Sequence, residues 1–300
     1  MKRLLSYVEI TTKITSTFAF LLTAAFLFYL NGPINWRLSL LFFAAMFLFD
    51  LATTAINNYI DTKTNQQTLQ FTRSTALAII FVLLGVSAFL GLYLVWLTDV
   101  VVLLLGGLCF LCGILYTFGP VPISRQPWGE ILSGIFYGFF IPFILLYINM
   151  PEGTFLTLEW NLQTVSLDLQ IVPISTAAIL SVIPVCCTAN IMLANNICDV
   201  EQDVLVKRYT LPYYLGRKAS LHLFAAVYYT TYLAMILMVA LKILAPLCLL
   251  SLATLIPVRK NIHTFFGEQV KSKTFITSIK NYVIIMGTDT ALIFLSGLVS

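Results

Sequence analysis

The pattern Asn-Asn-x-x-Asp occurs twice in this sequence, and each copy closes a long apolar stretch. The copies cover residues 57–61 and 195–199, and the polar series continues four residues later at Asn65 and at Asp203. On a helix of about 3.6 residues per turn, positions four apart share one face. Each copy therefore predicts a helix that ends in a stripe of carboxylate and amide oxygens.

Oxygen stripes of this kind suit a hard divalent cation. Mg²⁺ prefers carboxylate oxygens and completes an octahedron with water and substrate phosphates. Polar residues beside an apolar span are costly and usually lie in a protein interior or a wet cavity, although helix termination or solvated capping is the alternative. Two facing stripes predict a magnesium diphosphate site, with candidate metal ligands Asp61, Asn57, Asn65, Asp199, Asp203 and Asn195.

The composition indicates that membrane helices position these stripes. Hydrophobic residues make up 59% of the 300 residues and charged residues 10%, whereas about a quarter of a soluble domain is charged. A helix needs about 20 apolar residues to cross a bilayer. The hydropathy pattern predicts nine spans, at residues 14–30, 38–58, 74–95, 100–117, 130–148, 171–195, 219–240, 243–257 and 282–299.

The distribution of basic residues supports this topology. With the N-terminus in the cytoplasm, all of the 17 Lys and Arg residues except Arg37 and Lys242 fall on the cytoplasmic side, as the positive-inside rule predicts. Merging the seventh and eighth spans would move the basic stretch 259–280 to the other side. We therefore predict an all-α, nine-helix integral protein of the cell membrane, with one domain over residues 1–300 and its site facing the cytoplasm.

Other features argue against several classes of function. The net charge of +4 is spread over separate loops, so it reflects topology and lipid head groups and predicts no nucleic-acid partner. The six Cys residues lie mostly in apolar spans, which favours packing over redox or metal chemistry. His222 and His263 have no ligand-like neighbours in the sequence. No obligate protein partner is predicted.

A membrane transporter is the alternative from another class. Inverted repeats with a site near the midplane are typical of secondary transporters. The two Asn-Asn-x-x-Asp copies are separated by four spans, so both helices run in the same direction and end on one side. A parallel repeat of this kind weakens the transport interpretation without removing it.

A basic, Gly-containing sequence follows the second copy, with Lys207-Arg208, Thr210-Leu211 and Leu215-Gly216-Arg217. Together with residues 195–203 it resembles the second signature of the UbiA superfamily of intramembrane aromatic prenyltransferases. The first signature of that family, Asn-Asp-x-x-Asp-x-x-x-Asp, is similar to residues 57–65. The sequence departs from it at Asn58 and Asn65, where the family has Asp. Both keep an oxygen ligand and lose a charge, which should weaken Mg²⁺ binding at the first stripe.

The resemblance implies transfer of a polyprenyl group from an allylic polyprenyl diphosphate to a small aromatic acceptor, with Mg²⁺ as cofactor. Tyr116-Thr117-Phe118-Gly119-Pro120 and Gly129-Glu130 look most like the 1,4-dihydroxy-2-naphthoate prenyltransferases of menaquinone synthesis. The expected products are then demethylmenaquinone, CO₂ and diphosphate. Another acceptor, such as 4-hydroxybenzoate, is the alternative. The Asp-Gly-x-x-Ala-Arg signature of the CDP-alcohol phosphotransferases is absent from the sequence.

The same resemblance implies residue roles. The catalytic candidates are Asp61, Asp199, Asp203 and Lys207, and the substrate-binding candidates are Asn57, Asn58, Lys63, Asn195, Asn196, Arg208, Tyr116 and Lys13. For the basic residues the alternative is lipid anchoring or snorkelling, and for Tyr116 it is an interfacial aromatic belt. Asp50 lies seven residues before Asn57 on the same face, and we expect it to bond to another helix or to contact the acceptor.

Overall fold

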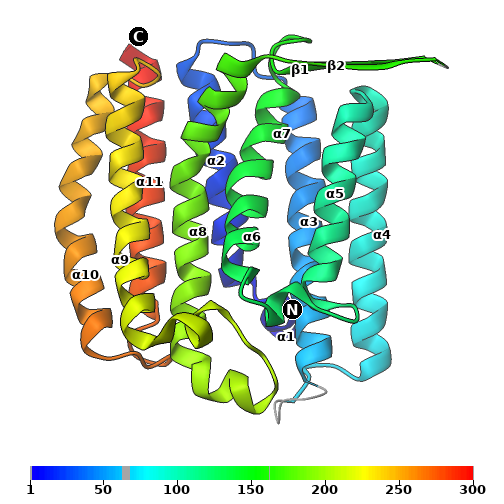
Figure 1. Cartoon of the computed structure of the whole chain (residues 1–300). Helices are drawn as coiled ribbons and strands as arrows, with labels where there is room; N and C mark the ends of the chain where they lie inside the picture. The colour runs from blue at the N-terminus through cyan, green and yellow to red at the C-terminus, as the bar shows by residue number, and fades with distance from the viewer. Residues whose placement is uncertain (1, 63–67, 162, 300) are drawn as a thin grey trace.

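Apolar runs form helices in a bilayer because each backbone N–H and C=O must find its partner within its own segment. The computed structural model describes residues 2–62, 68–161 and 163–299, and its long helices stand side by side (Figure 1). These helices are α2 (Ile14–Tyr29), α3 (Trp36–Asp61), α4 (Arg73–Leu97), α5 (Val100–Thr117), α8 (Ile171–Leu205), α9 (Leu211–Ala240) and α11 (Ile276–Val299). Short elements at the N-terminus and before α6 are α1 (Lys2–Tyr7), η1 (Ile10–Lys13) and η2 (Ile123–Arg125).

Eight helical stretches of the described chain are long and apolar enough to cross a membrane, so the protein is a multi-pass membrane protein. The predicted span 243–257 is not among them. It folds as a 3-10 helix, η4 (Pro246–Thr254), followed by α10 (Leu255–Gly267), which carries Arg259 and Lys260 and is therefore less apolar. In Figure 1 this segment still runs beside α9. The count of nine spans and the orientation of the N-terminus stay predictions.

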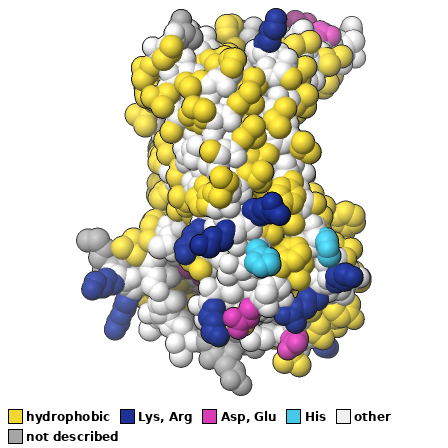
Figure 2. All heavy atoms as spheres, turned by 90° about the vertical axis from the view of Figure 1, so that its left-hand side faces the viewer, with side chains coloured by type: hydrophobic (Ala, Val, Ile, Leu, Met, Phe, Trp, Pro, Cys, Tyr) yellow, Lys and Arg dark blue, Asp and Glu magenta, His cyan; other side chains and the backbone are white. Residues whose placement is uncertain are grey.

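The outer surface has the polarity that a bilayer requires. Figure 2 shows one face on which hydrophobic side chains cover the middle of the molecule, while Lys, Arg and His side chains gather toward its lower end. An apolar belt bounded by basic residues is typical of a protein whose middle contacts lipid and whose end contacts head groups and water.

The predicted span 130–148 is interrupted. It consists of α6 (Gly129–Ile135), a π-helical turn, η3 (Phe136–Phe140), and α7 (Ile141–Tyr147). Gly138 lies in this turn, and a Cβ atom there would be only 2.2 Å from the backbone nitrogen of Val185 on α8. The absence of a side chain at residue 138 therefore lets the two backbones touch.

The segment between α7 and α8 contains a two-stranded antiparallel hairpin, β1 (Leu156–Trp160) and β2 (Val165–Leu169), which the sequence did not predict. Leu156 pairs with Leu169 at its base. The hairpin lies at the end of the bundle opposite the N-terminus (Figure 1). It is therefore remote from the ends of α3 and α8 that carry the two motifs.

Pairs of helices pack closely around the two motifs. Helix α3 packs on α4, α8 on α9 and α11 on α2. Helices α3 and α8 run in the same direction, away from the hairpin, and both reach the end of the bundle where the N-terminus lies (Figure 1). The polar stripes at their C-terminal ends are therefore brought to one end of the molecule.

Candidate active site

One large cavity joins the two motif-bearing helices. It has a volume of about 1720 Å³ and its walls come mainly from α3, α4, α5, the α6–α7 segment and α8. Its lining is largely apolar and includes Phe49, Leu92, Val95, Phe110 and Ile141. Its polar lining includes Glu9, Lys13, Asp50, Asn57, Asn58, Asp61, Tyr116, Asn195, Asp199, Gln202, Asp203, Arg208 and Lys271, together with several Ser and Thr residues. The cavity thus combines a charged region with a long apolar interior.

Three carboxylates line the charged region of the cavity. Asp61 ends α3, whereas Asp199 and Asp203 lie one turn apart on α8. Asp203 is repelled by the negative charges of both Asp199 and Asp61, so the three groups are close enough to interact. Carboxylates gather in this way where a cation compensates their charge.

The residues fit a magnesium ion that shares its coordination with a substrate. The Oδ2 atom of Asp203 is buried and has no hydrogen-bond partner in the described structure, which leaves one carboxylate oxygen available to a ligand. Among the described residues, no group of three or more His, Cys, Asp or Glu side chains could hold a metal ion by itself. Mg²⁺ commonly takes one or two carboxylates and completes its shell with water and phosphate oxygens, so a bound diphosphate would supply what the chain lacks.

Two arginines add positive charge beside the carboxylates. The Nε atom of Arg208 donates to the backbone oxygen of Ser124 at 2.9 Å and lies 3.8 Å from Asp203 Oδ1. Arg208 and Arg125 both attract the carboxylate of Asp61. These cations lie where the negative charge of a diphosphate would need them.

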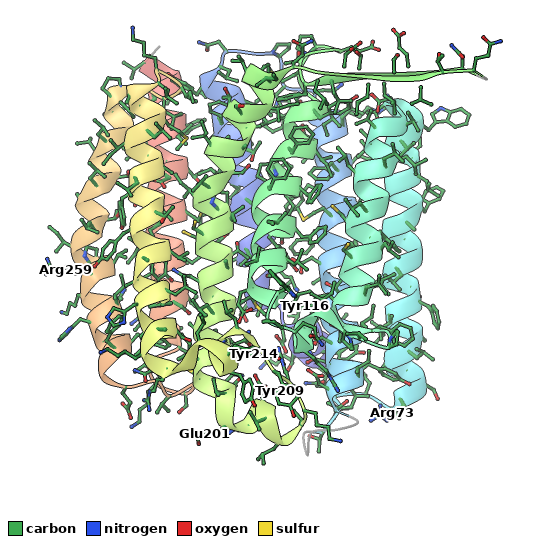
Figure 3. The ribbon with its side chains drawn as sticks, in the orientation of Figure 1. Arg73, Tyr116, Glu201, Tyr209, Tyr214 and Arg259 are labelled. Atoms are coloured by element: carbon green, nitrogen blue, oxygen red, sulfur yellow. The ribbon has the colours of Figure 1, made fainter. Side chains whose placement is uncertain are left out.

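Related contacts join two loops at the charged end of the cavity, whose lining includes Ser124 and Arg208. The backbone nitrogen of Tyr209 donates to the Arg125 oxygen at 3.1 Å, parallel to the bond from Arg208 to Ser124. Figure 3 shows Tyr209 and Tyr214 at this end of the bundle, with Tyr116 above them and Arg259 pointing outward from α10. These bonds hold together the loop after α5, with Ser124 and Arg125, and the loop after α8, with Arg208 and Tyr209. The two loops are called the cap below.

The predicted amide residues divide into two groups. Asn57 and Asn195 line the cavity, and Thr117 Oγ1 donates to Asn57 Oδ1 at 3.3 Å. Asn58 also borders the cavity, but its amide nitrogen donates to the backbone oxygen of Tyr7 at 2.8 Å and to Glu9 Oε1 at 3.1 Å. The amide of Asn58 is thus engaged in holding the N-terminal segment.

Asn196, although predicted to bind substrate, is buried outside the cavity lining. Its amide nitrogen donates to Glu130 Oε1 at 2.8 Å and so connects α8 to α6. Lys207 is exposed and also lies outside the described lining, in a left-handed backbone conformation with φ of 56°. Lys63 and Asn65 fall outside the described residues.

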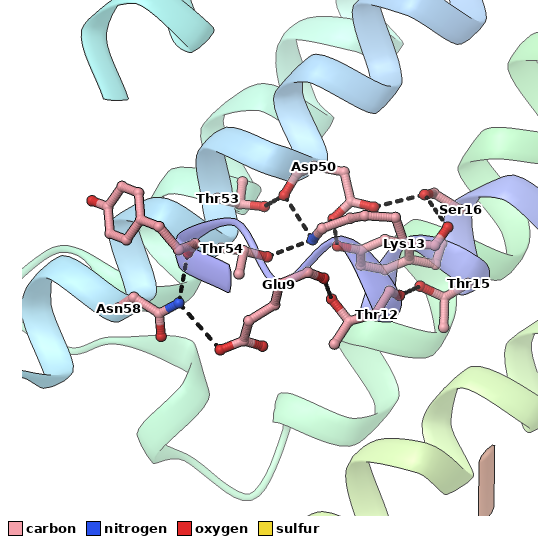
Figure 4. Close-up of polar contacts among 11 residues, drawn as sticks. Glu9, Thr12, Lys13, Thr15, Ser16, Asp50, Thr53, Thr54 and Asn58 are labelled. Atoms are coloured by element: carbon pink, nitrogen blue, oxygen red, sulfur yellow. Dashed lines mark hydrogen bonds and ion pairs between the residues drawn. The ribbon is translucent and has the colours of Figure 1, made fainter. Parts of the chain in front are cut away.

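Lys13 and Asp50 form a buried ion pair on the cavity wall (Figure 4). Lys13 Nζ donates to Asp50 Oδ1 at 2.7 Å, to the Asp50 backbone oxygen at 3.0 Å and to Thr54 Oγ1 at 2.5 Å. Asp50 also accepts from Ser16 Oγ at 2.6 Å and from Tyr137 OH at 2.7 Å. All three ammonium protons of Lys13 are therefore used within the protein, and the bond of Asp50 to another helix matches one of its two predicted roles.

Tyr116 lines the cavity between the cap and its interior, and its hydroxyl donates to the Gly129 oxygen at 3.4 Å. Two further residues of the site, Arg125 and Lys271, were not predicted from sequence. Lys271 Nζ contacts Asp199 Oδ2 from the segment between α10 and α11. The basic character of the loops was the one signal for these two residues, and it did not distinguish them from the other loop cations.

Comparison with known proteins places the chain among enzymes. The sequence profile of the UbiA prenyltransferase family matches residues 17–279. A 1,4-dihydroxy-2-naphthoate octaprenyltransferase of Bacillus subtilis (strain 168) is 28% identical over 233 residues, which are 71% of this chain and 68% of that protein.

Solved structures share the fold. A structure reported for a digeranylgeranylglyceryl phosphate synthase superposes with a TM-score of 0.68 at 18% identity, covering 100% of this chain and 99% of that one. A UbiA homolog from Archaeoglobus fulgidus, bound to GPP and Mg²⁺, superposes with a TM-score of 0.63 at 15% identity, covering 99% and 98%. Because the family profile spans most of the sequence, the chain belongs to the UbiA prenyltransferase family and is a membrane-embedded prenyltransferase.

Proposed function

We propose that this prenyltransferase transfers a polyprenyl group from an allylic polyprenyl diphosphate to 1,4-dihydroxy-2-naphthoate, releasing diphosphate and CO₂ and forming the reduced, hydroquinone form of demethylmenaquinone. The observation that carries the proposal is the single cavity that joins the carboxylates of both motifs to an apolar interior. A donor with a charged head and a hydrocarbon tail needs that combination. The naphthoate acceptor is supported by the Bacillus subtilis relative.

The proposed cofactor is Mg²⁺, with Asp61, Asp199 and Asp203 as carboxylate ligands and Asn57 and Asn195 as nearby amide oxygens. The unpartnered Oδ2 atom of Asp203 supports this assignment. When bound, the metal supplies neutralisation of the diphosphate charge and so favours departure of the leaving group. A UbiA homolog that binds GPP together with Mg²⁺ supports the same cofactor for this chain.

Arginine side chains of the protein are proposed to neutralise diphosphate charge alongside the metal. Arg208 and Arg125 attract Asp61, and with a diphosphate bound they would stabilise the negative charge that develops as the allylic C–O bond breaks. The allylic cation then reacts with the electron-rich ring of the acceptor, and the ring carboxylate leaves as CO₂. The apolar cavity walls keep water from that cation.

The acceptor is proposed to lie between the metal region and the Lys13–Asp50 pair, in contact with Tyr116. A second candidate function, prenylation of an aromatic acceptor that lacks a ring carboxylate, is favoured by one observation. The ammonium of Lys13 is fully occupied by Asp50 and Thr54 and so is not open to a ring carboxylate. We also propose that the site faces the cytoplasm. In the predicted topology almost all basic residues lie on the side of the membrane where the two motifs end, and the positive-inside rule makes that side cytoplasmic.

The test is prenylation by membranes that contain the protein. Farnesyl or a longer polyprenyl diphosphate, Mg²⁺ and 1,4-dihydroxy-2-naphthoate are supplied, and the products are identified by mass spectrometry. A prenylated, decarboxylated product that disappears with EDTA and with Asp199→Ala is the expected result. Turnover of a different aromatic acceptor alone would replace the naphthoate assignment with the second candidate. Uptake of an aromatic solute that survives Asp199→Ala, with no prenylated product, would contradict the proposed reaction.

A further inference from the structure

Lys271 reaches into the charged end of the cavity from the segment between α10 and α11. Its Nζ atom contacts Asp199 Oδ2, and the residue is part of the cavity lining. The side chain of Lys271 is 55% exposed, whereas that of Asp199 is only 13% exposed. An ammonium group thus extends from water to a largely buried carboxylate that is proposed to bind the metal.

The surroundings of Asp199 explain why a cation is needed there. Asp199 and Asp203 repel each other across one helical turn, and both lie in a partly desolvated cavity where such repulsion is strong. Lys271 offsets part of this charge. A metal ion that coordinates the same Asp199 oxygen must first displace the lysine, because the two cations would otherwise occupy the same space.

The segment can release the lysine without refolding. The backbone nitrogen of Val270 donates to Thr274 Oγ1 at 2.9 Å, and Arg217 Nε donates to Gln269 Oε1 at 2.5 Å. These bonds fix the chain on both sides of Lys271. The lysine stem is flexible and its ammonium is strongly hydrated, so a change of side-chain rotamer is enough to move the charge.

We propose that Lys271 is a displaceable cation of the donor site. Before the substrate binds, the Lys271 ammonium pairs with the Asp199 carboxylate. When a divalent metal coordinates Asp199, the ammonium would move to bind the diphosphate oxygens instead. This inference rests on the proposed role of Asp199 as a metal ligand. It assigns to one residue two opposite effects: Lys271 weakens the binding of metal alone and strengthens the binding of the metal-loaded donor.

Direct binding measurements on purified protein in lipid nanodiscs test both effects. Mn²⁺ is titrated without substrate and followed by electron paramagnetic resonance, and a non-reactive farnesyl thiodiphosphate is then titrated at saturating Mg²⁺. Lys271→Met is expected to tighten Mn²⁺ binding about fivefold, the range open to a partly exposed ion pair, and to weaken binding of the thiodiphosphate. Lys271→Arg should retain donor binding.

The matched control is Lys273→Met, because Lys273 pairs with Glu268 at 3.3 Å in the same segment and both side chains are well exposed, at 67% and 52%. This variant is expected to leave both affinities unchanged. Suppose that Asp199→Asn abolishes Mn²⁺ binding but Lys271→Met leaves it unchanged or weaker. That result would overturn the role of Lys271 while the metal ligand Asp199 stands. Full Mn²⁺ binding by Asp199→Asn would overturn the proposed metal ligand and the lysine's role with it.

Discussion

Asn58 occupies a position at which the family signature has aspartate, and its contacts give a physical reason for the amide. An amide nitrogen can donate to the Tyr7 oxygen and to the Glu9 carboxylate, as it does here. A carboxylate could donate to neither and would repel Glu9. Asn58 therefore holds the N-terminal segment against the first motif, a role that the spacing of the motif does not reveal.

Asn58→Asp should consequently destabilise the protein rather than improve its metal site. The loss of two donated hydrogen bonds and the new repulsion are expected to cost about 1 kcal/mol, given the partial exposure of the pair. Thermal unfolding in one detergent would measure the change, and adding Glu9→Gln should recover part of it. If the variant unfolds at the same temperature as the unmodified protein, this role of Asn58 is contradicted.

The Lys13–Asp50 pair can be tested in the same way. Lys13→Met leaves a buried carboxylate without its counter-charge and is expected to cost about 3 kcal/mol of unfolding free energy. Combining it with Asp50→Asn removes the stranded charge and keeps one acceptor oxygen, for either Ser16 or Tyr137, so the double variant should regain at least half of the loss. Denaturant unfolding of the single and double variants checks this. Equal instability of the two would show that charge pairing is not the cause.

Among the elements, the length of the apolar runs predicted most of the helices. The sequence did not predict local departures of the backbone from α-helical geometry. The predicted span 100–117 and helix α5 share their ends, and α8 continues past the predicted residue 195 because its polar stripe keeps the helical repeat. The sequence did not predict the π-helical turn at residues 136–140 or the division of 243–257 into η4 and α10. Both depend on contacts with neighbouring helices and on Pro246, which hydropathy does not resolve.

Gly138 provides a test at this scale. Gly138→Ala would place a methyl group against the backbone of α8, where neither partner can yield easily, so we expect a loss of at least about 2 kcal/mol. Gly85→Ala on α4 is the matched control, since a Cβ atom at residue 85 would meet no atom within 4 Å. The unfolding midpoints of both variants measure the difference. Similar midpoints would mean that η3 and α8 move apart at little cost in stability.

For the whole molecule, the motifs correctly predicted which helix ends line one cavity, because each motif carries carboxylate and amide oxygens at helical spacing on a polar stripe. The individual roles were less accessible to sequence. Asn196 was assigned to substrate but bonds Glu130, and Lys271 was passed over although it contacts Asp199. Those distinctions depend on which helix faces which, and that information lies in long-range packing.

Topology gives a prediction for the entire chain. Leu167→Cys, in the hairpin, is expected to react with a membrane-impermeant maleimide in intact cells, because the hairpin lies at the end of the bundle opposite the motifs. Lys273→Cys should react only after the cells are opened, because the positive-inside pattern places it in the cytoplasm. The unmodified protein serves as the background for its native cysteines. The reverse labelling pattern would invert the predicted orientation.

Helix α8 has 35 residues and is therefore about 52 Å long, against about 30 Å for the hydrocarbon core of a bilayer. Its last turns, with Asp199 and Asp203, can thus reach beyond the acyl chains, where ions diffuse freely, while the prenyl tail stays dissolved in lipid. The proposed donor, a polyprenyl diphosphate, would then reach the enzyme by lateral diffusion in two dimensions. Saturation of the enzyme should follow the mole fraction of prenyl diphosphate in the bilayer, so that diluting the donor with inert phospholipid would lower the rate at constant bulk concentration.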